Sequence, residues 1–237
     1  MDTEVWNPAT DPWITQRFDA QDLSGKSACK RAVVQAAQLD DATGPLMVCI
    51  GRLSTQKGVD LLLQCLPELV DMGFRVVIQG SGDPTLESAV RAEAQLLSGR
   101  VQAYIGYDEA RAHQLMSAAD VVAVPSRFEP CGLTQLYGMR YGALPLVRRT
   151  GGLADTVGDI LDARANAALG PGFVFDALTP QSFLHAATRA ADLFQTDSHS
   201  WQQLIRRAMQ VDHGWSGPAQ QYVRLYEEVS SEHARAR

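Results

Sequence analysis

The stretch LMVCIGRLSTQKGVDLLLQCLPELVDMGFRVVIQG, residues 46–80, predicts a strand, a helix and a second strand in succession. Its two ends, 46–52 and 74–80, are short, apolar and β-branched, which is typical of strands buried on both faces. Between them, apolar residues recur at the spacing of one helix face: Val59, Leu62, Leu63, Leu66, Leu69 and Val70. This order is typical of two parallel strands joined by a crossover helix.

The same alternation continues along the chain. Further strands are predicted at 101–107, 120–126, 144–149 and 172–175. Two helix starts are marked by an N-cap residue followed by proline at the first helical position: Asp83-Pro84 and Thr179-Pro180. The predicted fold class is α/β, a doubly wound and Rossmann-like parallel sheet with helices on both faces.

The C-terminal part of the chain, from about 179 to 237, contains helical patterns and no further strand. We predict that these segments are helices that pack on the sheet. Their aromatic residues are expected in the core: Trp201, Trp215, Tyr222 and Tyr226. The whole chain, 1–237, is therefore predicted to be one domain.

Composition limits the function classes. The chain has 237 residues, 46% of them hydrophobic, so it can bury a core. Its net charge is −6 and its basic residues are dispersed, which disfavours binding to nucleic acid or to an acidic membrane. No apolar run approaches the length of about 20 residues that crosses a bilayer. The first residues lack a secretory signal pattern, so a cytoplasmic location is expected.

The cysteines show no C-x-x-C pair. Cys29, Cys49 and Cys65 lie among apolar neighbours and are expected to be buried thiols, in keeping with a reducing compartment. We likewise expect His113, which lies in a helix beside Leu115, to be a packing or surface residue and not a proton shuttle.

Polar loops that carry glycine follow the predicted strands. In parallel sheets of this kind, ligands bind outside the carboxyl ends of the strands, where such loops meet. Arg52 and Lys57 flank the first loop and could together reach one diphosphate, although two basic loop residues could equally be a solvated surface. The second loop, GSGDP, lacks the third glycine of the dinucleotide fingerprint, so it favours a tight turn over a phosphate cradle.

The loop PSRFEPCGLTQLYG, residues 125–138, is more informative. A helix is predicted to begin at about Leu133 and Thr134, where free amide groups and a threonine hydroxyl favour an anion. Glu129 would repel a phosphate and is better suited to a neutral polyol such as a sugar. The pattern indicates a nucleotide-sugar site, and the alternative is a capped helix with a surface carboxylate.

Three stretches give the chain a resemblance to a known family. These are DTEVWNPATDP (2–12), GRLSTQKGVDLL (51–62) and the block from IGYDEARAHQ to RRTGGLADTV (105–157). Over about residues 2–226 the chain resembles the C-terminal half of bacterial glycogen synthase, a retaining glucosyltransferase that extends an α-1,4-glucan from ADP-glucose. The resemblance implies a GT-B fold, in which two Rossmann-like domains face each other.

The resemblance implies that this chain is the donor-binding domain and that its partners are ADP and ADP-glucose. The α-1,4-glucan acceptor would bind to an N-terminal domain, whose Lys-x-Gly-Gly-Leu loop is absent from this sequence. No cofactor and no metal are implied, because arginine, lysine and a helix terminus neutralise the phosphates.

The family's functional residues map onto matching positions. Arg52 and Lys57 would contact the diphosphate, and Glu129 would bind a glucose hydroxyl; these three are the expected catalytic residues. The remaining positions are expected to bind the donor: Tyr107 on the adenine, Cys131 on the glucose, Gly132, Leu133 and Thr134 on the distal phosphate, and Gly151 and Gly152 where their loop approaches the phosphates.

Two departures qualify the match. Many retaining GT-B enzymes have a second glutamate at the position of Tyr137. This chain lacks that glutamate, and in this respect it resembles the bacterial glycogen synthases. Because half of the cleft is absent, we expect the chain alone to bind ADP or ADP-glucose weakly and to transfer little or no glucose. An exposed interdomain face could promote self-association. The alternatives are a non-catalytic nucleotide-binding or regulatory module, and a related transferase that uses a UDP-sugar.

Overall fold

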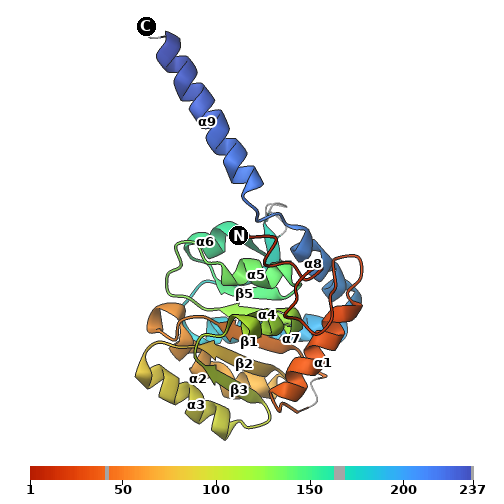
Figure 1. The fold of residues 1–237 in the computed structure, drawn as a ribbon. Helices are drawn as coiled ribbons and strands as arrows, with labels where there is room; N and C mark the ends of the chain where they lie inside the picture. Colours follow the sequence, from red (N-terminus) through yellow and green to blue (C-terminus); the bar gives the residue numbers. More distant parts are fainter. Residues whose placement is uncertain (41–42, 163–168, 236–237) are drawn as a thin grey trace.

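A computed structural model describes residues 1–40, 43–162 and 169–235 of the chain. Its centre is a seven-stranded sheet in the order β3-β2-β1-β4-β5-β7-β6, and all the strand pairs described are parallel (Figure 1). The strands are β1 (Leu46–Ile50), β2 (Arg75–Gly80), β3 (Val101–Ile105), β4 (Val121–Val124), β5 (Leu144–Arg148), β6 (Val157–Asp159) and β7 (Gly170–Phe175). The Rossmann-like fold class is therefore confirmed.

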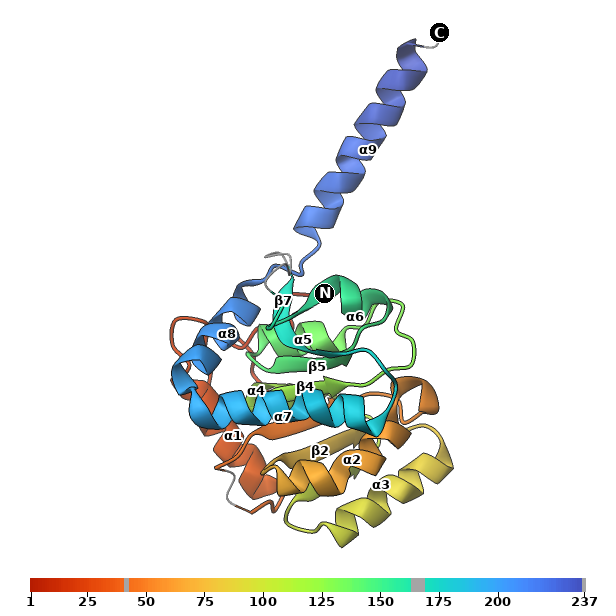
Figure 2. The ribbon, with the colours of Figure 1, turned by 180° about the vertical axis from the view of Figure 1, so that it is seen from behind.

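The helices of the described residues lie on the two faces of the sheet, apart from the last one. They are α1 (Ser24–Ala36), η1 (Thr55–Lys57), α2 (Val59–Asp71), α3 (Pro84–Leu96), α4 (Glu109–Ala118), α5 (Thr134–Arg140), α6 (Gly151–Thr156), α7 (Pro180–Thr196), α8 (Ser198–Gln210) and α9 (Ser216–Arg235). Helices α2, α3 and α7 lie on one face, and α4 and α5 lie on the other with α1 against α4 (Figures 1 and 2). This two-sided arrangement follows from right-handed crossovers that run first in one direction from β1 and then in the other.

The six strands predicted from the sequence all form, and so do the predicted helix starts. The Asp83 side chain accepts hydrogen bonds from the amides of Thr85 and Leu86, and Thr179 accepts one from Ser182. Helix α2 buries its apolar face against the sheet and ends before Gly73, whose φ of +95° favours glycine. The local sequence patterns therefore predict the ends of these elements correctly.

Strand β6 was not predicted. It has only three residues, too few for an alternating or apolar pattern to be recognised. Its position is fixed by distant partners: Asp159 accepts a hydrogen bond from the Val174 amide at 2.8 Å and forms an ion pair with Arg189 of α7 at 2.8 Å. Tertiary contacts, not local propensity, define this strand.

The N-terminal segment, residues 1–22, packs across α4 and α5. The Trp6 ring stacks between His113 at 3.9 Å and Tyr137 at 3.8 Å. The buried Asp11 carboxylate accepts a hydrogen bond from the Tyr141 hydroxyl at 2.5 Å and lies 2.6 Å from His113 Nδ1. His113 is therefore a buried packing residue, as expected from the sequence. Tyr137 also stacks on this segment, through its contact with Trp6.

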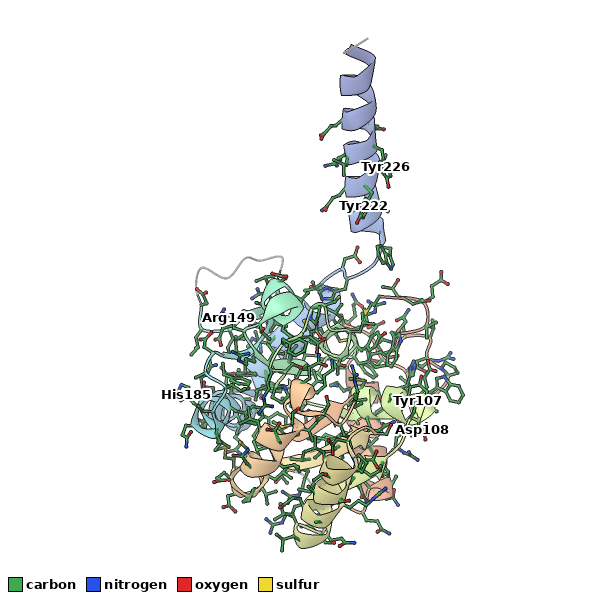
Figure 3. The ribbon with its side chains drawn as sticks, turned by 90° about the vertical axis from the view of Figure 1, so that its left-hand side faces the viewer. Tyr107, Asp108, Arg149, His185, Tyr222 and Tyr226 are labelled. Atoms are coloured by element: carbon green, nitrogen blue, oxygen red, sulfur yellow. The ribbon has the colours of Figure 1, made fainter. Side chains whose placement is uncertain are left out.

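The C-terminal helices divide into two groups. Helices α7 and α8 pack on the sheet, and Trp201 is buried as expected, with 4% of its surface exposed. Helix α9 projects away from the body, and Figure 3 shows Tyr222 and Tyr226 on it. The prediction that Trp215, Tyr222 and Tyr226 lie in the core is wrong, because these residues are 69%, 56% and 65% exposed. Aromatic content indicates that a helix face can be buried but not what buries it.

Two further expectations concern thiols and membranes. Cys29, Cys49 and Cys65 are buried and unpaired, as predicted, whereas Cys131 is exposed. Across the described ranges of the chain, no helix combines the length and the apolar character needed to cross a bilayer.

Candidate functional site

The predicted site residues gather at the carboxyl ends of β1 and β4. These two strands are neighbours, and the strand order reverses between them because β2 and β5 lie on opposite sides of the pair. In open parallel sheets a reversal of this kind leaves a crevice in which ligands bind. The loops after β1 and β4 carry Arg52, Lys57, Glu129 and Thr134 to this crevice.

The loop after β1 is folded tightly by local hydrogen bonds. The Ser54 hydroxyl accepts a hydrogen bond from the Lys57 amide at 3.4 Å, which caps the short helix η1. Gly58 then turns the chain with a φ of +72°. A Cβ atom on Gly58 would lie 2.0 Å from the Pro125 carbonyl oxygen, so glycine is required for the loops after β1 and β4 to touch.

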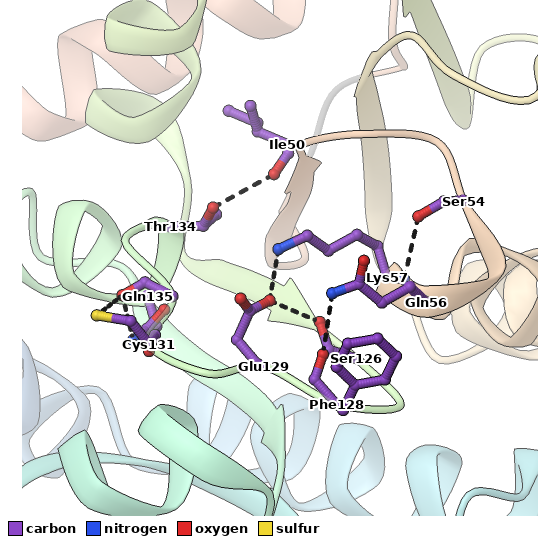
Figure 4. Close-up of polar contacts among 11 residues, drawn as sticks. Ile50, Ser54, Gln56, Lys57, Ser126, Phe128, Glu129, Cys131, Thr134 and Gln135 are labelled. Carbon is purple, nitrogen blue, oxygen red and sulfur yellow. Dashed lines mark hydrogen bonds and ion pairs between the residues drawn. The ribbon is translucent and has the colours of Figure 1, made fainter.

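Lys57 and Glu129 form an ion pair across the crevice (Figure 4). The distance from Lys57 Nζ to Glu129 Oε2 is 2.5 Å, and the Ser126 hydroxyl donates to the same carboxylate oxygen at 3.1 Å. Glu129 is buried, with 6% of its surface exposed. The carboxylate is therefore compensated by a lysine and a hydroxyl and is not the surface group of the alternative interpretation.

A second ion pair holds the Glu129 loop in place. Arg127 donates to both Asp60 carboxylate oxygens at 2.7 Å, and its amide donates to the Gln56 carbonyl oxygen at 2.8 Å. The Arg127 guanidinium lowers the pKa of Asp60 below its ordinary value of 3.8, although partial burial opposes this shift. The loop after β4 is thus tied to the first turn of α2.

The start of α5 faces the loop after β1. The Thr134 hydroxyl donates to the Ile50 carbonyl oxygen at 3.5 Å, and among the described residues no side chain caps this helix end. Gly132 has a φ of +76°, and Leu133 is 46% exposed. The turn is closed by the Gln135 side-chain amide, which donates to the carbonyl oxygens of Cys131 at 3.3 Å and Gly132 at 3.0 Å.

Arg52, Lys57 and Thr134 line one small hollow of about 20 Å³. Cys49 also lines it, and burial raises the pKa of this thiol to about 12 while Lys57 opposes the shift. The thiol is therefore protonated near neutral pH, which disfavours a role as nucleophile. The hollow presents two cationic side chains, a hydroxyl and a helix end.

A larger pocket of about 460 Å³ lies beside this hollow and also includes Arg52. Its other lining residues are Ile50, Gly51, Gln79, Gly80, Ser81, Gly106, Tyr107, Asp108 and Ala112. Tyr107 lies at its edge, 85% exposed, and its hydroxyl donates to Glu109 at 3.1 Å, which raises the Tyr107 pKa (Figure 3). The structure thus places Arg52 between the hollow and the pocket.

Gly151 and Gly152 contact the Glu129 loop directly. A Cβ atom on Gly151 would lie 2.1 Å from the Glu129 carbonyl oxygen, and one on Gly152 would lie 2.1 Å from that of Cys131. The Gly152 amide also donates to the Glu129 carbonyl oxygen at 2.9 Å. Besides the predicted approach to the phosphates, the small size of these glycines is required where the start of α6 meets the Glu129 loop.

The glycines of GSGDP have a similar explanation. A Cβ atom on Gly80 would lie 1.8 Å from the Gly51 carbonyl oxygen, and one on Gly82 would lie 2.3 Å from that of Leu53. This close contact supports the tight-turn interpretation of the motif.

Sequence reasoning missed Ser126, Arg127 and Gln79. Ser126 and Arg127 lie inside the loop 125–138, which the sequence indicated as a site. Their contacts with Glu129 and Asp60, however, are determined by the fold. Gln79 carried a signal that was not used, because it is a polar residue in the otherwise apolar run VVIQG. Within the described part of the chain, no group of three His, Cys, Asp or Glu side chains is placed to hold a metal ion.

The sequence profile of the family described as glycosyl transferases group 1 matches residues 32–193. The chain belongs to this family. Glycogen synthase of Serratia proteamaculans (strain 568) is 44% identical over 231 residues, which cover 97% of this chain and 48% of that protein. Glycogen synthase of Yersinia pestis (strain Pestoides F) is 44% identical over 227 residues, or 95% of this chain and 48% of the relative. The chain spans about half the length of these relatives.

Comparison with solved structures leads to the same fold. The catalytic domain of starch synthase IV from Arabidopsis thaliana, solved bound to ADP and acarbose, superposes with a TM-score of 0.91 at 37% identity, over 98% of this chain and 48% of that one. A sucrose-phosphate synthase from Thermosynechococcus elongatus, at 21% identity and a TM-score of 0.60 over 85% of this chain and 49% of that one, shares the fold. The chain is thus a group 1 glycosyl transferase domain that is similar to about half of these glycogen synthases and of the starch synthase catalytic domain.

Proposed function

We propose that this chain is the donor-binding half of an ADP-glucose-dependent glycogen synthase. The observation that carries the proposal is the convergence of Arg52, Lys57 and Thr134 on one hollow beside the buried Glu129. Cations and a helix end suit a diphosphate, and the adjoining pocket has the volume for a nucleoside.

Each group has a role in holding the donor. Arg52 and Lys57 bind the diphosphate, while the Thr134 hydroxyl and the amides of Gly132 and Leu133 bind its distal phosphate. The nucleoside occupies the pocket of about 460 Å³, with Tyr107 against the base. Cys131, which is exposed next to Glu129, lines the space for the glucose.

Glucose transfer with retention breaks the bond between the anomeric carbon and the phosphate oxygen. Positive charge then grows on the sugar and negative charge on the leaving diphosphate. Arg52, Lys57 and the start of α5 are aimed at the leaving group, so they stabilise the transition state more than the ground state. In this proposal these groups take the part of a metal ion.

The Lys57–Glu129 pair has a consequence for binding. In the structure the two charges neutralise each other at 2.5 Å. When the donor binds, Lys57 turns toward the diphosphate and Glu129 accepts a hydrogen bond from a sugar hydroxyl in its place. The ion pair keeps a buried carboxylate compensated until the donor arrives.

The acceptor glucan binds to the other half of a two-domain enzyme. Without that half the site is open to water and no acceptor is held, so the chain alone binds ADP or ADP-glucose weakly and transfers little glucose.

The proposal places the enzyme in the cytoplasm. It includes self-association of the isolated chain through the site rim, where Tyr107, Phe128 and Leu133 are 85%, 58% and 46% exposed.

The test is transfer of glucose from ADP-glucose to glycogen, with this chain alone and with it fused to the complementary half of the Serratia proteamaculans relative. We expect activity only in the fusion. In that background Arg52→Ala and Lys57→Ala should each raise the barrier by about 2 to 4 kcal/mol, a slowing of about 30- to 1,000-fold. The control is Arg91→Ala on α3, where the side chain is 55% exposed and remote from the crevice.

Three outcomes would contradict the proposal. ADP binding without transfer in the fusion would favour a nucleotide-binding module. Faster transfer from UDP-glucose than from ADP-glucose would favour a related transferase. Unchanged rates in both the Arg52→Ala and Lys57→Ala fusions would remove these residues from the reaction.

A further inference from the structure

Gln79 is one of the residues that line the large pocket. Strand pairing places Gln79 beside Ile50 of β1 and Tyr104 of β3, so these three side chains share one face of the sheet. Gln79 and Ile50 both line the pocket whose edge is formed by Tyr107. A polar side chain is therefore buried, with 3% exposed, in the space assigned above to the nucleoside.

One end of the Gln79 amide is bonded and the other is not. Its Nε2 donates to the Asp108 carbonyl oxygen at 2.6 Å. A carbonyl oxygen can only accept, so this bond fixes the orientation of the amide and leaves Oε1 as the free end. In the described part of the chain Oε1 is buried and has no hydrogen-bond partner.

A buried acceptor without a partner is unfavourable, by about 1 to 3 kcal/mol, and calls for a functional explanation. Because Oε1 is buried, a ligand donor reaches it only after a small shift of the groups that cover it.

We propose that Gln79 Oε1 selects the base of the nucleotide by accepting a hydrogen bond from an exocyclic amino group. Adenine offers such a donor, whereas hypoxanthine and uracil present a carbonyl oxygen that Oε1 repels. Gln79 is thus a specificity-determining residue that favours an adenine nucleotide. This inference rests on the proposed function, because it assumes that the base occupies this pocket.

The experiment measures the dissociation constants of ADP and IDP for this chain by calorimetry, with Gln79→Met as the variant. IDP differs from ADP at the group in question, where it carries a carbonyl oxygen in place of the amino group. We expect the wild-type chain to bind ADP roughly five-fold more tightly than IDP, the value of one neutral hydrogen bond. In Gln79→Met the two constants should become equal, mainly through weaker binding of ADP.

The matched control is Gln102→Met on β3. This glutamine is also partly buried and donates to a backbone carbonyl, that of Ala37, but it does not line the pocket. The control should retain the wild-type preference for ADP. It separates a general loss of stability from a loss of base recognition.

The possible failures are distinguishable. If Gln79→Met weakens ADP and IDP by the same factor, Gln79 only positions the Tyr107 loop and the inference is overturned while the proposed function stands. Equal affinity of the wild-type chain for ADP and IDP would likewise overturn the inference and leave the proposed function standing. If neither nucleotide binds at millimolar concentration, the proposed function and the inference fail together.

Discussion

At the scale of single residues, the site depends on how Glu129 is compensated. A carboxylate with 6% exposure is unfavourable unless it is paired, and Lys57 and Ser126 supply the partners. Arg52 differs, since it is exposed and makes no ion pair in the described part of the chain. Arg52 and Lys57 therefore differ in their effect on the stability of the fold, although both are proposed to bind the diphosphate.

This difference predicts unequal stability changes. Lys57→Ala leaves Glu129 buried without a cation and should lower the free energy of unfolding by about 2 kcal/mol. Arg52→Ala should change it by less than about 0.5 kcal/mol, as is usual for exposed positions. Urea unfolding followed by circular dichroism measures both values. Equal stability of the two variants would show that the Lys57–Glu129 pair does not compensate the carboxylate in solution.

The grouping of Arg52, Lys57 and Thr134 could be predicted from the sequence because one rule suffices: loops after parallel strands meet at one edge. The pairing of Lys57 with Glu129 could not. The two residues lie 72 positions apart, and no periodic pattern specifies which side chains touch across a crevice. Gln79 was open to prediction as a polar residue in a buried strand, but its partner, the Asp108 carbonyl, was not.

At the scale of elements, the loop after β4 is held by its neighbours more than by its own sequence. Arg127 joins it to Asp60 of α2, and Gly152 packs its backbone against Cys131. Local signals predicted where α5 begins, because Gly132 and the helix pattern are local. They missed β6 and the contacts of Gly151 and Gly152 with the Glu129 loop, since both depend on segments distant in the sequence.

The Asp60–Arg127 pair predicts a dependence on pH. The folded-state pKa of Asp60 lies below its ordinary value of 3.8, so the pair contributes fully above that pH and is lost as the pH falls through the folded value. Asp60→Asn should therefore be less stable than wild type at pH 7, by less than about 1 kcal/mol because solvent screens the pair. The deficit should begin to shrink as the pH falls below about 4 and should disappear once the pH lies below the folded-state pKa of Asp60.

Urea midpoints measured across this pH range provide the comparison. Asp71→Asn, at the other end of α2, is the control, because Asp71 makes no ion pair in the described ranges. A deficit in Asp60→Asn that stays constant from pH 7 to pH 3 would argue against the pair as its cause.

At the scale of the whole molecule, the chain has the architecture of about half of the starch synthase IV catalytic domain. It superposes on 48% of the starch synthase IV domain, and its α9 extends from the body with Tyr222 and Tyr226 exposed. The fold class could be predicted in full because alternating strands and helices have few topological solutions. The direction of α9 could not, because nothing in its own pattern states what it contacts.

The central claim is that a nucleotide diphosphate binds at the carboxyl ends of β1 and β4. The most direct measurement is a crystal structure of this chain grown with excess ADP. We predict electron density for the diphosphate between Arg52, Lys57 and the amides of residues 132–134, with the base in the pocket beside Tyr107. An empty crevice at saturating ADP, or a diphosphate bound elsewhere with Lys57 still paired to Glu129, would contradict the account.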